Sequence, residues 1–158
     1  MKLTSLDIEI ATAQYFGWRQ NVIVPNVHWG LGLHYEADLV VLRPSGWAIE
    51  IEIKTSAADI RADLKKRRQH DSNLFRELYF AVPECLTENA NIPEHAGILS
   101  VYWHGACGPW RVKKIRDAER RKTAHKWKPE TRQKLYELAT MRTWSLKQHL
   151  QGKIRRER

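Results

Sequence analysis

Residues 34–56 read HYEADLVVLRPSGWAIEIEIKTS, and this stretch predicts a β-hairpin. Residues 39–42 form a short apolar run rich in strand-forming side chains. Pro44 and Gly46 suit a turn. Residues 47–54 then alternate between aliphatic and charged side chains, which is the period of a β-strand. We therefore expect two antiparallel strands joined by a turn.

One face of the second strand of this hairpin is predicted to be charged. Alternation places three isoleucines on one face and three charged side chains on the other, namely Glu50, Glu52 and Lys54. Folding the hairpin back brings Asp38, at the start of the first strand, beside Glu52 and Lys54. Two carboxylates with open positions for water and phosphate are what a Mg²⁺ site requires. The ammonium could orient or deprotonate a water, or stabilise charge on a phosphate.

Asp38 and the tripeptide Glu52-Ile53-Lys54 resemble the motif of the PD-(D/E)XK nuclease superfamily, in which an Asp and a Glu-Xaa-Lys lie on neighbouring strands. The resemblance implies that Asp38 and Glu52 bind Mg²⁺, for which Mn²⁺ can substitute. It also implies that Ile53 could offer its backbone carbonyl to the metal. Lys54 would be the catalytic lysine, acting together with Asp38 and Glu52. The residue before Asp38 is Ala37, where the motif has a proline.

The order of segments after the hairpin is similar to the MmcB-like branch of this superfamily, small proteins assigned to DNA repair. The similarity covers roughly residues 5–145 and includes KTS at 54–56 and LYFAVP at 78–83. It implies an α/β fold with a restriction-endonuclease-like core of order αβββαβ. The branch commonly has a basic residue two positions before the metal-binding Asp, and this chain has Glu36 there. The roles of Glu36 and Glu50 stay open.

The first predicted helix supplies a further acidic candidate. Residues 4–7 offer capping side chains at its start. Its predicted apolar stripe consists of Leu6, Ile10, Ala13, Tyr15 and Phe16. The first helix of the superfamily often lends an acid to the metal site, which makes Glu9 a candidate and Asp7 an alternative. Glu9 could instead be a surface acid near the helix N-terminus.

The rest of the chain completes a single α/β domain over residues 1–158, with a core of about 5–115 and a basic helical extension of about 116–158. Further strands are expected at 20–27, 78–83, 97–102 and 110–115, and helices at 57–70, 116–122 and 129–151, with a frayed tail at 153–158. We expect a mixed sheet of about four or five strands with helices on both faces.

The charge of the chain is unevenly distributed. Residues 1–110 hold 10 Lys and Arg against 13 Asp and Glu, whereas residues 111–158 hold 17 against 5, and the net charge is +9. A basic half of this kind favours a polyanionic partner, and with the motif it predicts DNA. The alternative is a solvated basic helix face.

The side chains predicted to contact DNA lie in two regions. The helix after the hairpin offers Lys65, Lys66 and Gln69, and the extension offers Arg120, Arg121 and Lys126. Trp127 and Trp144 lie among cations and could stack on bases. They could equally pack on the domain, with the cations facing solvent.

The chain shows neither a signal-peptide pattern nor a run long enough to cross a membrane. Its two cysteines suggest reduced thiols in the cytoplasm. Both a monomer and a homodimer fit the resemblance.

The sequence thus predicts a Mg²⁺-dependent deoxyribonuclease that hydrolyses phosphodiester bonds in DNA repair or recombination. One alternative is a non-catalytic nucleic-acid-binding module on the same fold, and another is an assembly factor. If the charged face of the hairpin is merely a solvated outer face, no site exists there.

Overall fold

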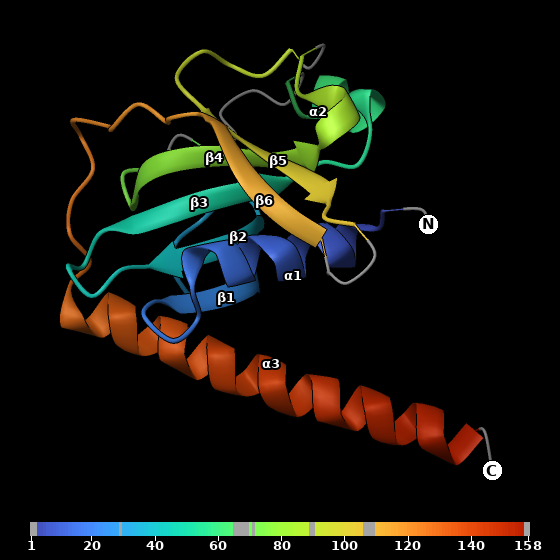
Figure 1. Ribbon diagram of the computed structural model, residues 1–158. Helices are drawn as coiled ribbons and strands as arrows, with labels where there is room; N and C mark the ends of the chain where they lie inside the picture. The colour runs from blue at the N-terminus through green and yellow to red at the C-terminus, as the bar shows by residue number, and fades with distance from the viewer. Residues whose placement is uncertain are drawn as a thin grey trace.

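The structure is a computed structural model that describes residues 3–28, 30–64, 70, 72–88, 91–105 and 110–156. Its elements, in chain order, are α1 (Ser5–Phe16), β1 (Val22–Val27), β2 (Ala37–Leu42), β3 (Ala48–Ile53), α2 (Ala57–Leu64), β4 (Phe75–Pro83), the 3-10 helix η1 (Glu84–Leu86), β5 (Gly97–Trp103), β6 (Trp110–Arg116) and α3 (Pro129–Arg156). Figure 1 shows them around one twisted sheet. The α/β class and the predicted hairpin are therefore confirmed.

The sheet has six strands in the order β1-β2-β3-β4-β5-β6 among the described residues, whereas the sequence predicted four or five. The first three strands are mutually antiparallel, β3 to β5 are parallel, and β6 returns antiparallel to β5. The parallel step from β3 to β4 uses the α2 crossover. β3 therefore lies inside the sheet, with hydrogen-bonded neighbours on both sides.

The two faces of the sheet are covered differently (Figure 1). α1 covers one face, where its Ile8 and Ala11 pack on Leu39, Ile49 and Ile51. The other face has two separate apolar clusters, one around Trp127 and α3 and the other around Ile60 of α2, and it includes the even-numbered residues of β3. Glu50 and Glu52 lie in β3 on this face, and neither belongs to either apolar cluster. The prediction of helices on both faces is confirmed.

The capping prediction for α1 is confirmed, but the predicted stripe is wrong for three of its five residues, since only Ala13 and Phe16 pack against the core. Thr4 and Asp7 form a capping box at the start of the helix. The buried residues of α1 are Ile8, Ala11 and Thr12. They recur at i, i+3 and i+4 and include a polar residue, so a count of apolar residues missed this face. Of the predicted stripe, Leu6, Ile10 and Tyr15 are exposed.

A helix predicted at 116–122 does not form, because the segment donates its backbone hydrogens to the ends of the sheet. Residues 117–128, which we call the strap, run from β6 to α3 without helix. Arg121 N–H donates to Arg76 O at 2.9 Å, and Trp127 N–H donates to Gly46 O at 2.8 Å. The Trp127 indole is buried and donates to Leu74 O at 2.6 Å. Tertiary contacts here override helix propensity.

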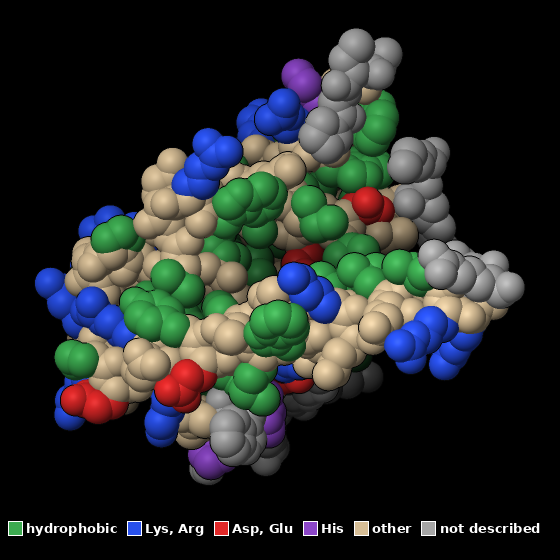
Figure 2. Space-filling model, turned by 90° about the horizontal axis from the view of Figure 1, so that it is seen from below, with side chains coloured by type: hydrophobic (Ala, Val, Ile, Leu, Met, Phe, Trp, Pro, Cys, Tyr) green, Lys and Arg blue, Asp and Glu red, His purple; other side chains and the backbone are tan. Residues whose placement is uncertain are grey.

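α3 begins at Pro129, as predicted, and continues beyond the predicted end at residue 151 to Arg156. Only Leu135 and Leu138 are buried, against β1 and β2. Every residue from 141 to 156 is exposed. The view from below, the side on which α3 lies, shows hydrophobic side chains interspersed with Lys and Arg (Figure 2). The predicted frayed tail is therefore wrong for residues 153–156.

Across the part of the chain that the structure describes, no helix combines the length and the apolar character needed to cross a bilayer.

We expect Trp127→Ala to destabilise the domain by about 3–5 kcal/mol, because it removes a buried indole and leaves Leu74 O without its donor. Trp144→Ala is the matched control, since the Trp144 side chain is 60% exposed and that of Trp127 is 2% exposed. We expect less than about 1 kcal/mol for the control. Urea unfolding followed by circular dichroism measures both values. Equal losses in the two variants would contradict the packing described for the strap.

Candidate functional site

The hairpin brings Asp38 to the end of β3. The register pairs Leu39 with Ile51 and Val40 with Glu50, which places Asp38 opposite Glu52. The carboxylate of Asp38 accepts a hydrogen bond from the Ile53 backbone N–H at 2.8 Å. This contact fixes the Asp38 oxygen beside the last residues of β3.

Lys54 completes the predicted group. Its Nζ lies 2.7 Å from Glu52 Oε2 and 4.0 Å from Asp38 Oδ2. Its backbone N–H donates to Ala81 O at 3.1 Å, which ties the end of β3 to β4. The Lys54 side chain is only 11% exposed. The structure thus brings Asp38, Glu52 and Lys54 together, as the sequence predicted.

Burial excludes the solvated-face interpretation of the hairpin. Glu50 is 0% exposed and Glu52 is 2% exposed, although both are carboxylates in the middle of a sheet. Charged side chains are almost never buried to this degree unless they are paired or coordinate a metal.

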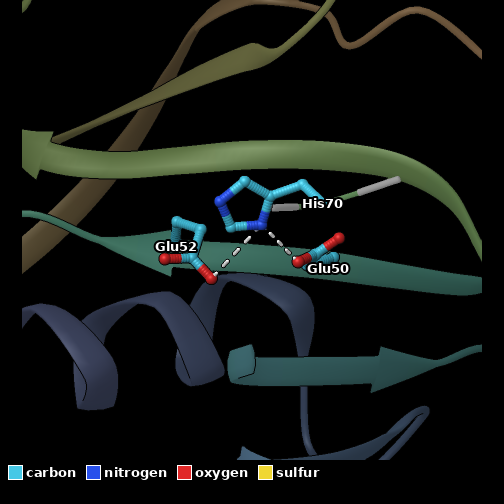
Figure 3. Close-up of side chains that lie close together, drawn as sticks. All are labelled: Glu50, Glu52 and His70. Atoms are coloured by element: carbon cyan, nitrogen blue, oxygen red, sulfur yellow. Dashed lines mark hydrogen bonds and ion pairs between the residues drawn. The ribbon is translucent and has the colours of Figure 1, made fainter. Parts of the chain in front are cut away.

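A histidine that the sequence did not single out joins the two glutamates. His70 Nδ1 lies 2.6 Å from Glu50 Oε1 and 3.7 Å from Glu52 Oε1 (Figure 3). The imidazole packs edge-on against Tyr35, at 5.2 Å between ring centroids, and against Phe80, at 6.1 Å. His70 itself has a φ of 70°, in the left-handed region. The ring is therefore held in place on two sides.

Burial raises the pKa values of three side chains in and around the site, and neighbouring negative charge adds to the rise. Burial, followed by the charge of Asp38, raises the pKa of Glu52 to about 7, although Lys54 and His70 oppose the rise. Burial and then the charge of Asp38 also raise the pKa of Glu9. The pKa of the Tyr35 hydroxyl is raised by burial and then by Glu50. Glu9 and Tyr35 thus lie close to the two ends of this group.

Two carboxylate oxygens in the site are buried without a hydrogen-bond partner among the described residues, namely Glu50 Oε2 and Glu52 Oε1. Buried oxygens of this kind call for a proton or a cation. The donor set of Asp38 and Glu52 fits a hard divalent cation such as Mg²⁺, and Glu9 is close enough to Asp38 to feel its charge.

The other predicted site residues are distributed as follows. Asp7 belongs to the cap of α1, and exposed Glu36 accepts a hydrogen bond from Asn26. Lys65, Lys66 and Gln69 lie outside the described residues. On the strap, Arg120 is exposed and ion-paired with Glu77, Arg121 donates to Ser72 O, and Lys126 is exposed. Trp127 is buried and unable to stack on a base, whereas Trp144 is exposed.

Comparison with known proteins gives one informative match. No family model matches the chain, and no curated protein matches it. Among solved structures, the chain is similar to the SPO1766 protein of unknown function from Silicibacter pomeroyi, with a TM-score of 0.66, 22% identity, and coverage of 96% of this chain and 94% of that chain. This similarity shows the fold alone.

We expect Glu52→Gln to stabilise the metal-free protein relative to wild type, increasingly so as the pH rises from 5 to 8. A carboxyl group whose pKa rises from 4.5 to about 7 on folding binds its proton more tightly in the folded state. The protonated Glu52 side chain therefore stabilises the folded wild type fully below a pH of about 4.5, and this stabilisation is lost as the pH rises through 7. We expect the difference in free energy of unfolding between variant and wild type to grow by more than about 1 kcal/mol between the two pH values.

Urea unfolding in EDTA at both pH values measures this difference. Glu94→Gln is the control, because Glu94 is an exposed carboxylate away from the site. A difference that stays constant with pH for Glu52→Gln would show that burial does not disfavour its charge.

Proposed function

We propose that this protein is a Mg²⁺-dependent nuclease that hydrolyses DNA phosphodiester bonds. The observation on which the proposal rests is the convergence of Asp38, Glu52 and Lys54 at the end of β3, with Lys54 Nζ 2.7 Å from Glu52 and 4.0 Å from Asp38. Two carboxylates and one ammonium in a partly buried group are suited to binding a metal and a phosphate together.

Each residue of the group has a distinct role in this proposal. Asp38 and Glu52 hold Mg²⁺, the Ile53 carbonyl is a further ligand, and Glu9 is a supporting acid. When bound, Mg²⁺ supplies Lewis-acid polarisation of the phosphate and a water of lowered pKa. In this proposal Lys54 acts as an ammonium paired with two carboxylates. It therefore orients the attacking water and stabilises charge on the phosphate, rather than acting as a base.

The order of elements supports the PD-(D/E)XK assignment. The chain runs α1-β1-β2-β3-α2-β4, which is the αβββαβ order implied by the sequence resemblance, and β3 and β4 are parallel. With the resemblance to the MmcB-like branch, this order favours a role in DNA repair or recombination.

Cations on the strap favour DNA as the substrate. Arg121 of the strap lies close enough to Tyr35 for its charge to oppose the rise in the pKa of that hydroxyl. Arg120 and Lys126 are exposed on the same strap. Lys and Arg here neutralise phosphates, so binding should weaken steeply with salt.

We expect cleavage of single-stranded, duplex or branched DNA that requires Mg²⁺ or Mn²⁺ and is absent in EDTA. Lys54→Ala should lower kcat by at least about 100-fold, because it removes the group that stabilises charge in the transition state. A gel assay on the three substrates measures this loss. Lys114→Ala is the matched control, since exposed Lys114 on β6 pairs with Asp117.

Binding is measured on the same substrates by fluorescence anisotropy at two salt concentrations. Retained, salt-dependent binding by Lys54→Ala separates catalysis from affinity. A folded wild type that binds DNA and cuts none of the substrates would contradict the nuclease and favour the non-catalytic binding module. Binding that is absent or insensitive to salt would favour the assembly factor.

A further inference from the structure

The ligand atoms of Glu50, Glu52 and His70 all lie within 4.8 Å of one another. Both glutamates come from β3, and His70 enters from the segment before β4 (Figure 3). His70 is 8% exposed and both carboxylates are less so. The site thus contains one imidazole nitrogen and two carboxylates in a nearly dry environment.

The separations of these atoms match a coordination sphere. A first-row divalent ion with bonds of about 2.0–2.2 Å to nitrogen and oxygen holds adjacent ligand atoms about 3 Å apart. His70 Nδ1 lies 2.6 Å from one carboxylate oxygen and 3.7 Å from the other. Small side-chain rotations would equalise the two separations around an ion.

Among the described residues, two buried carboxylate oxygens of the cluster have no hydrogen-bond partner. Lys54 contacts Glu52 through Oε2, while the buried Oε1 of Glu52 faces His70 without a hydrogen bond among the described residues. Glu50 Oε2 is likewise buried without such a bond in the described part of the chain. A proton shared between His70 and Glu50 would satisfy one oxygen, whereas a divalent cation would bind oxygens of both glutamates.

We propose that Glu50, Glu52 and His70 form a binding site for a first-row transition-metal ion, such as Mn²⁺, Co²⁺ or Zn²⁺. The imidazole ligand decides the class of metal, because nitrogen donors favour transition metals over Mg²⁺ and Ca²⁺. Tyr35 and Phe80 hold the ring in the required orientation.

Glu52 connects this site to the proposed nuclease centre. Its Oε2 faces Lys54 and its Oε1 faces His70, so one oxygen points toward the proposed nuclease centre and the other toward the histidine site. If the proposed function holds, Glu52 would be a ligand shared by the two metal sites. The binding of a transition metal by His70 does not depend on that function.

Metal-free protein titrated with Co²⁺, followed by visible absorption and calorimetry, tests the site. We expect one ion per chain bound at least ~100-fold more tightly than Mg²⁺. His70→Gln and Glu50→Gln should each weaken Co²⁺ binding by at least ~100-fold, because each removes a direct ligand. His95→Gln, with an exposed histidine, is the matched control and should bind as wild type does. Asp38→Asn should retain the Co²⁺ site.

A second measurement needs no variant. The anomalous signal of a Co²⁺-loaded wild-type crystal should place the ion between His70 Nδ1 and the two carboxylates. An ion located elsewhere, or Co²⁺ affinity unchanged in both His70→Gln and Glu50→Gln, would overturn the proposal and leave a buried hydrogen bond. If Co²⁺ binding depends on His70 but the protein cleaves no DNA, the metal site is supported and only the proposed nuclease function is contradicted.

Discussion

The structure depends on the burial of two carboxylates, Glu50 and Glu52, in an interior strand. Each has a neighbouring strand on both sides, and the reverse face of β3 is covered by α1. Ionised carboxylates in such a place cost several kcal/mol unless they are compensated. Aliphatic side chains at these two positions would join the two apolar clusters of this face into one. The chain instead keeps a charged gap between them, and local departures of this kind from a well-packed core are typical of functional sites.

The side chains that surround the two glutamates come from three parts of the chain, and this explains what the sequence could predict. Lys54 lies two residues from Glu52 on the same strand, and Asp38 lies across a hairpin whose turn and alternation are readable from the sequence. Those contacts are local, so the Asp38, Glu52 and Lys54 group was predictable. His70 is separated from Glu50 by the α2 crossover, and no spacing rule relates the two. Its place is set by the packing of Tyr35 and Phe80, which only the fold reveals.

The strap is a second place where long-range contacts made the sequence-based prediction fail. A helix was predicted at residues 116–122, and that prediction was wrong because the strap's backbone hydrogens bond to the start of β4 and to the β2–β3 turn. Trp127 likewise lies among cations in the sequence, yet its indole is buried in the cluster that anchors α3. The periodicity of hydrophobic residues and the distribution of charge predict helices and strands. Long-range hydrogen bonds, which the sequence does not reveal, decide which polar segments stay extended. The strap in turn places Arg121 near Tyr35, at the edge of the site.

The opposed charges of the site and its surroundings define how a nucleic acid could reach it. In the proposed nuclease, cations on the strap and α3 would attract a phosphate backbone, whereas Asp38, Glu50 and Glu52 outnumber Lys54 at the centre and would repel it. Burial, and after it the charge of Asp38, raises the pKa of Glu52 to about 7. Protonation of the carboxylates would remove the repulsion, but also their capacity to bind metal. A bound divalent cation would offset the net negative charge of these side chains while leaving the carboxylates ionised. In the proposed enzyme, phosphate entry is therefore thermodynamically coupled to metal binding, since each lowers the electrostatic cost of the other.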